Sequence, residues 1–336
     1  MKAFDNKIIF IVGNSRSGTT MMSESLGRHD EIHSFKEIHF FEGFFSTKNF
    51  EKKMNKIEAK KFLNEMITIQ VQGFYNRKNA NKFSDISELI LSNLDKNEMT
   101  PILLYINFLL FWANKNGKSI PCEQTPKNAL YLNHFSKYLP NAIFINMIRD
   151  PRAIALSQKF KFQRLKFGNH SFFESIREWT NYHPIITSII WNSYINSTEK
   201  YKLINLLNIK YEDIVSNPKK NMINISKFCG FNYHDNILMN SNTGSSIQSD
   251  NKSVKGFDDS KIHNWKKILS KEEIHIVQSI TKKNMKLFKY DIYQSKPNLV
   301  IIFTHLLTLP LKLLLSIIFN FKNSDYIQAL IKRLKL

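Results

Sequence analysis

The sequence predicts an α/β fold of three layers, in which helices flank a central parallel β-sheet. Two apolar segments with strand character, residues 8–12 and 142–148, each lead directly into a segment compatible with a helix. A loop bounded by glycines and rich in small hydroxylated residues follows the first of them. Strands that alternate with helices favour a parallel sheet, whose strands end along one common edge.

The loop at residues 13–20, GNSRSGTT, predicts a site for an oxyanion. Its backbone N–H groups and the positive end of the following helix dipole would converge on one point. The loop resembles a Walker A motif, which makes the fold P-loop-type, but Thr19 stands where the phosphate-binding lysine should be. This argues against an NTPase. The candidate anion-binding residues are Arg16, Ser17, Gly18, Thr19 and Thr20.

The remaining elements follow from apolar spacing and from helix-end signals. Residues 50–116 are expected to be mostly helical, and 122–127 to form a loop before a short helix that ends near residue 138. Further expected elements are a helix with Asp150 near its N-cap, one long helix over 172–199, a strand over 202–211, a helix over 218–228 and a helix opened by the capping box 270–273. We expect one domain over 1–296, with 50–116 inserted on the acceptor side, and a separate segment over 297–336.

Arg149 and Ser157 suggest a second anion site. Arg149 directly follows the strand 142–148, and Ser157 lies eight residues later, about two turns into the next helix. Because parallel strands end at one edge, Arg16 and Arg149 should lie near each other. The loop 13–20 would then bind one end of a nucleotide, and Arg149 with Ser157 a separate phosphate.

With these two motifs, the chain resembles the sulfotransferases that use 3′-phosphoadenosine-5′-phosphosulfate (PAPS), in particular the tyrosylprotein and carbohydrate branch. Loop 13–20 matches the family's 5′-phosphosulfate loop, and residues 145–157, INMIRDPRAIALS, match its 3′-phosphate motif. Further similarity lies in residues 210–218 and around Trp265, so the resemblance runs from about residue 7 to 293. It implies PAPS as donor, metal-independent transfer, and nucleotide contacts by Arg149, Ser157 and Tyr211.

Transfer of a sulfuryl group requires a base that accepts the proton of the acceptor hydroxyl. Glu37 lies twenty-one residues after Arg16, at the offset where the family's catalytic glutamate follows its loop. The chain should return to the same sheet edge along a second strand, which would bring Glu37 near the sulfate. His39 is the second candidate base, because imidazole titrates near neutral pH. Glu123 is a further carboxylate that we expect to be mainly structural.

One position departs from the family pattern. Relatives often carry a lysine before Thr-Pro, where it stabilises the transferring group, but this chain has Gln124 there. Lys127 or a cation elsewhere would replace it, or turnover would be slow. The polar loop 241–260, with Ser245, Ser246, Lys252 and Lys255, is expected either to fold over the 3′-phosphate or to be a solvated loop.

Residues 298–321 are apolar enough and long enough to span a bilayer, but Pro310 and Lys312 interrupt them. They could form two short core helices, an in-plane or re-entrant membrane anchor, or a true span. The break expected at Pro310 and the basic end of the chain favour the in-plane anchor. The net charge of +20 suits anionic ligands or an anionic membrane surface, and no nucleic-acid-binding motif accompanies it.

Two cysteines give neither a disulfide framework nor a zinc-site spacing, and the charged start shows no signal-peptide pattern. A cytoplasmic protein, associated with the membrane through 298–321, is therefore expected, and the oligomeric state stays open. The acceptor is expected to be a hydroxyl compound. A glycan, a lipid-linked sugar, a small metabolite and a tyrosyl protein all fit, and an apolar membrane-bound segment favours a lipid or lipid-linked glycan. The alternatives are a P-loop nucleotide kinase and a catalytically inactive, membrane-associated nucleotide-binding protein of the same fold.

Overall fold

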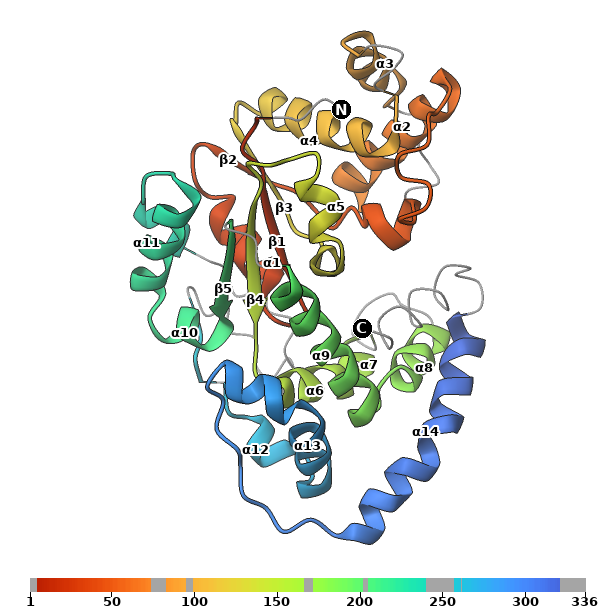
Figure 1. Cartoon of the computed structure of the whole chain (residues 1–336), viewed down its shortest axis with the longest axis vertical. Helices are drawn as coiled ribbons and strands as arrows, with labels where there is room; N and C mark the ends of the chain where they lie inside the picture. Colours follow the sequence, from red (N-terminus) through yellow and green to blue (C-terminus); the bar gives the residue numbers. More distant parts are fainter. Residues whose placement is uncertain are drawn as a thin grey trace.

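The structure is a computed structural model that describes residues 5–73, 83–94, 99–165, 172–201, 205–239, 257–260 and 262–320. Its centre is a five-stranded sheet in the order β2-β3-β1-β4-β5, with every neighbouring pair parallel. The strands are β1 (Ile9–Gly13), β2 (Ile32–Ser34), β3 (Ile120–Glu123), β4 (Ile143–Ile148) and β5 (Leu206–Lys210). The predicted α/β fold with a central parallel sheet is confirmed (Figure 1).

Alternate side chains of β1 enter two separate cores, as the two-residue period of a strand requires. Phe10 and its even-numbered neighbours pack with α2 (Lys56–Gln72), α4 (Pro101–Lys115) and α5 (Leu132–Ser136). Ile9 and Ile11 pack on the other face, with α1 (Thr19–Leu26) and α11 (Pro218–Cys229). The sheet is therefore apolar on both faces and covered on both.

The helical region over 50–116 contains α2, α3 (Ser84–Ser92) and α4 in its described part, as expected. The 3-10 helix η4 (Pro126–Leu130) and the π-type turn η1 (Phe40–Phe44) complete this side of the sheet. Beyond β4 come α6 (Pro151–Lys159), α7 (Lys161–Leu165), α8 (Phe172–Thr180), α9 (Pro184–Lys200), α10 (Tyr211–Ser216) and η5 (Asp235–Leu238). Asp150 caps α6 by accepting a hydrogen bond from the Arg152 N–H at 2.9 Å, as predicted.

Three expectations about these elements are corrected. Residues 120–123 form the interior strand β3, whereas a loop was expected over 122–127. The strand has only four residues and contains Pro121, so its sequence has no strand pattern. The long helix expected over 172–199 is two helices, because Pro184 opens α9 at its first turn. The apolar segment after Asn298 is one continuous helix, α14 (Leu299–Asn320). Pro310 lies inside this helix and does not divide it into two short helices.

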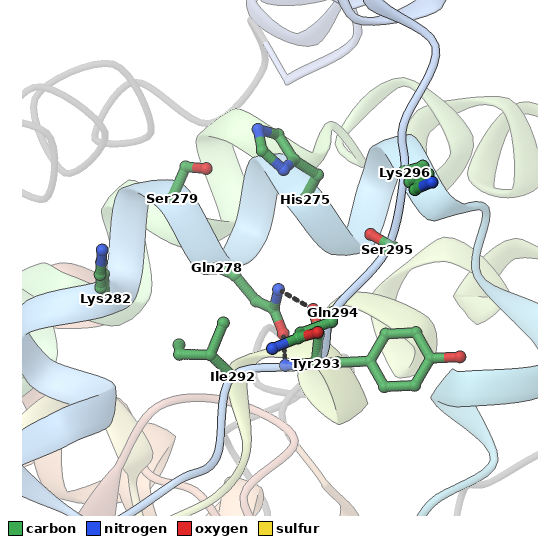
Figure 2. Close-up of a pocket in the computed structure, with 9 residues that line it drawn as sticks. All are labelled: His275, Gln278, Ser279, Lys282, Ile292, Tyr293, Gln294, Ser295 and Lys296. Atoms are coloured by element: carbon green, nitrogen blue, oxygen red, sulfur yellow. Dashed lines mark hydrogen bonds between the residues drawn. The ribbon is translucent and has the colours of Figure 1, made fainter.

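The C-terminal part of the described chain packs below the sheet edge in Figure 1 and leads to α14 along one side. It contains α12 (Trp265–Ile268) and α13 (Lys271–Leu287), which begins with the predicted capping box of Ser270 and Glu273. An extended segment over 290–298 then crosses α13 and encloses a pocket of about 620 Å³ (Figure 2). The Gln278 amide binds both the N–H and the C=O of Tyr293, at 2.8 and 3.0 Å, and thereby fixes this segment.

Candidate active site

The candidate residues collect along the carboxyl edge of the sheet, in the order that the strands impose. Glu37 follows β2, Glu123 ends β3, Arg16 follows β1, Arg149 follows β4 and Tyr211 follows β5. Glu37 and Glu123 thus lie over the half of the edge formed by β2 and β3, and Arg149 and Tyr211 over the half formed by β4 and β5. Loop 13–20, which contains Arg16, lies between the two halves. This is the edge where open parallel sheets bind their ligands.

The loop after β1 has an unusual backbone. Gly13, Arg16 and Gly18 all have positive φ, at 137°, 75° and 90°. A Cβ on Gly13 would lie 2.4 Å from the Met147 carbonyl oxygen, so β4 approaches the loop more closely than any other residue would permit. Arg16 is held in a left-handed conformation that is strained for a residue with a side chain, and such strain concentrates at functional sites.

The structure brings the two predicted anion-binding motifs into direct contact. The Arg16 Nε donates a hydrogen bond to the Ser157 hydroxyl at 3.0 Å. The Arg149 Nη1 donates to the Arg16 carbonyl oxygen at 2.9 Å, and the Arg149 guanidinium lies 4.2 Å from the centre of the Tyr211 ring. The Tyr211 ring also lies against Gly18, where a Cβ would be 2.5 Å from the ring. Five of the predicted nucleotide-binding residues thus form one cluster.

This cluster fits an anionic group with several oxygens. The Ser17 hydroxyl and the Arg149 Nε are buried and have no hydrogen-bond partner in the described part of the chain. Buried donors of this kind are costly unless a ligand satisfies them. Two guanidinium groups and the N-terminus of α1 add positive potential at the same place. Thr19 and Thr20 form the first turn of α1, as the loop motif predicts.

Glu37 and His39 form a pair over the other half of the edge. The His39 Nε2 lies 3.1 Å from the Glu37 Oε2, and the side chains are 20% and 36% exposed, so both are accessible from solvent. His39 has φ 55°, and its N–H donates to the Thr125 hydroxyl at 3.3 Å, which ties the segment to the end of β3. A carboxylate and an imidazole in contact can accept and pass on a proton.

Glu123 lies directly behind this pair and is fully buried. Its carboxyl group accepts hydrogen bonds from the Thr125 N–H at 3.2 Å, from the Thr125 hydroxyl, and from the Asn128 amide at 2.8 Å. Burial raises the pKa of Glu123 to about 7, and the negative charge of Glu37 adds to the rise. These contacts are those of a residue that shapes the loop, in agreement with the structural role expected from the sequence.

Gln124 lies between these groups and is buried, and its Oε1 has no partner in the described part of the chain. Lys127, the expected substitute cation, lies 3.3 Å from the Glu42 Oε2. Glu42 also accepts from the Tyr131 hydroxyl at 2.9 Å and has φ 65°. In the sequence, the signal for Glu42 is its place five residues after Glu37 on an aromatic segment, and it was not among the predicted site residues.

A second layer of contacts holds Arg149 and Tyr211 in place. Asp150 pairs with Arg152 at 2.7 Å, and the Arg152 guanidinium lies 3.8 Å from the Trp265 ring. Glu212 accepts from the Asp150 N–H at 3.0 Å, and burial raises its pKa. The residues around 210–218 and Trp265, selected for family resemblance alone, thus reach the site through Asp150.

Lys255, Ser245, Ser246 and Lys252 lie outside the described residues, so their predicted role over the 3′-phosphate stays a prediction. Among the described residues, no group of three or more His, Cys, Asp or Glu side chains is arranged to hold a metal ion. Cys122 and Cys229 are free and buried.

Comparison with known proteins agrees with the geometry. Residues 9–235 match the model of the sulfotransferase family. The chain belongs to this family. Protein-tyrosine sulfotransferase A of Caenorhabditis elegans is 25% identical over 237 residues, which are 68% of this chain and 51% of that protein. The chain thus spans about half the length of this relative. PAPS is the donor typical of this family.

Solved sulfotransferase structures share the fold. The sulfotransferase domain of the olefin synthase of Synechococcus PCC 7002 aligns with a TM-score of 0.57 at 18% identity, over 87% of this chain and 98% of that domain. The sulfotransferase domain from the curacin biosynthetic pathway aligns with a TM-score of 0.50 at 16% identity, over 86% of this chain and 99% of that domain. At these identities the similarity concerns the fold alone.

Proposed function

We propose that this sulfotransferase moves the sulfuryl group of PAPS to a hydroxyl of a glycan or lipid-linked acceptor, without a metal ion. The observation that carries the proposal is the contact of Arg16 with Ser157 and of Arg149 with Arg16, which joins the two nucleotide motifs at one sheet edge. In the proposed complex, Arg149 and Ser157 bind the 3′-phosphate. Arg16, Ser17 and the N–H groups of the loop bind the phosphosulfate.

Glu37 is the proposed base. It would accept the proton of the acceptor hydroxyl as the oxygen attacks sulfur, while the bond from sulfur to the bridging phosphate oxygen breaks. Arg16 and the N-terminus of α1 would stabilise the negative charge that develops on this leaving oxygen. The contact with His39 at 3.1 Å supports this role, because it orients the Glu37 carboxylate and offers a route for the proton.

Gln124 stands where relatives often have a lysine that stabilises the transferring group, so this mechanism lacks that positive charge. In this proposal Lys127 does not replace the usual lysine, because its Nζ lies 3.3 Å from the Glu42 Oε2. We propose that Arg16 alone supplies the positive side chain at the bridging oxygen, and that turnover is correspondingly slow. The amide of Gln124 remains available as a hydrogen-bond donor.

The acceptor class rests on the surroundings of the site. Helices α2, α3 and α4 pack with Phe35, Ile38 and Phe40, which flank Glu37 in the sequence, and would shape the acceptor pocket. The exposed apolar helix α14 favours an acceptor that is lipid-linked, and a membrane contact on the cytoplasmic side. Similarity to a protein-tyrosine sulfotransferase makes a tyrosyl hydroxyl the second candidate.

The test uses the purified full chain with radiolabelled PAPS and three acceptor sets: lipid extracts, glycans, and tyrosine-containing peptides. Label in the lipid or glycan set supports the proposal. Label in the peptides alone would show that the acceptor is a tyrosyl hydroxyl instead. Binding of PAPS or of its desulfated product PAP without transfer to any set would indicate an inactive protein of the same fold. Label transferred from ATP, and none from PAPS, would indicate a kinase.

A further inference from the structure

Helix α14 exposes a continuous row of apolar side chains. Its members recur every three or four residues, so they occupy one face of the helix. Each is between 55 and 70% exposed. We call this row the apolar stripe: Val300, Phe303, Leu307, Leu311, Leu314 and Ile318. Over 300–318 it is about 27 Å long.

The opposite face of α14 is polar and is turned toward the protein. The Lys312 Nζ donates to the Trp179 carbonyl oxygen at 3.1 Å and lies over the Trp179 ring. The Ser316 hydroxyl and the Asn320 amide both donate to the Asn181 Oδ1, at 2.7 and 3.0 Å. This is the reverse of a helix on the surface of a soluble protein, which buries its apolar face.

The contacts fix α14 along its length and at its start. The His183 ring lies 3.0 Å from the His305 carbonyl oxygen, one to two turns before Lys312. Glu272 accepts from the Asn298 N–H at 2.9 Å, and Gln278 holds the preceding segment at Tyr293 (Figure 2). A helix that crossed a bilayer would have to break these hydrogen bonds. In Figure 1 α14 accordingly lies along the molecule beside α8.

Only 6% of the apolar window of α14 is buried, which distinguishes it from the core helix of a soluble protein. Its exposed polar side chains are also satisfied within the helix. The Thr304 hydroxyl donates to the Ile301 carbonyl oxygen at 2.7 Å, and the Thr308 hydroxyl to that of His305 at 3.1 Å. Polar groups that face hydrocarbon require such internal partners.

The charges around the stripe favour an anionic lipid surface over a second protein. Helix α14 contains no acidic residue, and Lys282 and Lys296 line the pocket next to its start (Figure 2). In the sequence, residues 321–336 carry four basic side chains and one acidic one. Helix α8, which packs beside α14, also exposes Phe173 and Trp179, and aromatic rings are suited to the lipid–water interface.

We propose that α14 docks in the plane of an anionic bilayer, with its apolar stripe in the outer hydrocarbon and its polar face on the sulfotransferase domain. This inference rests on the membrane contact in the proposed function and specifies how that contact is made. It can be tested separately from the transfer of the sulfuryl group. Docking would keep the protein at the membrane surface, where a lipid-linked hydroxyl is accessible.

The experiment is flotation of the purified full chain with vesicles of phosphatidylcholine alone or mixed with phosphatidylglycerol. The wild type should float with the mixed vesicles, and less at high salt or with phosphatidylcholine alone. Replacing two stripe residues, L307D/L314D, should lower the partition coefficient about a hundred-fold, because two leucines can no longer enter hydrocarbon. The matched control I57D/L89D changes two other exposed apolar residues, 82 and 52% accessible, and should float as the wild type.

PAP affinity of each variant, measured by calorimetry, reports on the folded domain and separates failure of docking from failure of the proposed chemistry. A wild type that stays in solution, or an L307D/L314D variant that floats unchanged, overturns the proposal. So does a lipid-free dimer that the same double change dissociates, because a second copy would then cover the stripe.

The in-plane orientation has its own test. A fluorophore attached at Val300→Cys, Leu307→Cys or Leu314→Cys should be quenched equally by lipids brominated near the headgroup, because all three lie at one depth. Native Cys122 and Cys229 are buried and should not react. Quenching by lipids brominated near the bilayer centre that is strongest at Leu307 would indicate a spanning helix and contradict in-plane docking.

Discussion

The Arg16 Nε and the Ser157 hydroxyl are joined by a 3.0 Å hydrogen bond across 141 residues of sequence. The bond connects the loop after β1 with the second turn of α6, which follows β4. Since β1 and β4 are neighbours in the sheet, this contact follows from the register that pairs Gly13 with Met147. The bond thus joins the guanidinium of Arg16, in the loop motif, to the hydroxyl of Ser157, in the second anion-binding motif.

Arg149→Ala should raise the KM for PAPS about 10- to 100-fold and change kcat little, since a charge-assisted contact made equally in the ground and transition states is lost. Steady-state kinetics at varied PAPS measure both constants. Lys137→Ala, which removes an exposed ion pair with Glu51, is the matched control and should leave both unchanged. A large fall in kcat at saturating PAPS would show that Arg149 acts in the transition state.

Glu37→Gln should lower kcat by about 10²- to 10⁴-fold, because the amide cannot accept the acceptor proton. PAP affinity should stay as in the wild type, since Glu37 lies on the β2 half of the edge, away from the arginines. Single-turnover assays and calorimetry measure the two quantities. His39→Gln keeps a polar group and should lower kcat less than Glu37→Gln does. If His39→Gln lowers kcat more, the histidine is the base.

Gly18→Ala should weaken PAP binding and destabilise the fold, because its φ is 90° and the new Cβ would meet the Tyr211 ring at 2.5 Å. Gly117→Ala is a matched control, with φ 68° and no atom within 4 Å of the new Cβ. It should cost only the backbone strain, about 1 kcal/mol in the free energy of unfolding. Equal losses of stability and unchanged PAP affinity in both variants would mean that Tyr211 moves aside freely.

The sequence predicts the strands β1 and β4 because long apolar runs end at clear helix signals. It does not predict β3, since four residues containing Pro121 carry no strand pattern, although they become central by pairing with β1 and β2. The break expected at Pro310 is absent because proline removes one helical hydrogen bond, while contacts of His305 and Lys312 hold α14 on either side of it.

The site is predictable to the extent that parallel strands share an edge. This rule places Arg16 and Arg149 together, as observed. The contacts of the Tyr211 ring with Gly18 and with Arg149 depend on side-chain directions that residue spacing does not encode. The burial of Glu123 likewise becomes visible only when Thr125 and Asn128 fold around its carboxyl group.

Glu123 should make stability depend on pH. Burial raises its pKa from 4.5 to about 7, so between these values the folded protein binds a proton that the unfolded chain releases. The stabilisation is complete below pH 4.5 and is lost as the pH rises through 7, with an amount on the order of 3 kcal/mol. Urea unfolding at pH 5 and pH 8 should therefore show a decrease in the wild type that Glu123→Gln largely removes.

A carboxylate with the opposite shift provides the control. Hydrogen bonds from Lys137 and Tyr138 lower the pKa of Glu51, so its contribution is lost only as the pH falls below the usual range of a glutamate. Glu51→Gln should then leave the difference between pH 5 and pH 8 as in the wild type. If Glu123→Gln behaves in the same way, Glu123 is ionised throughout, and its negative charge would lie directly behind Glu37.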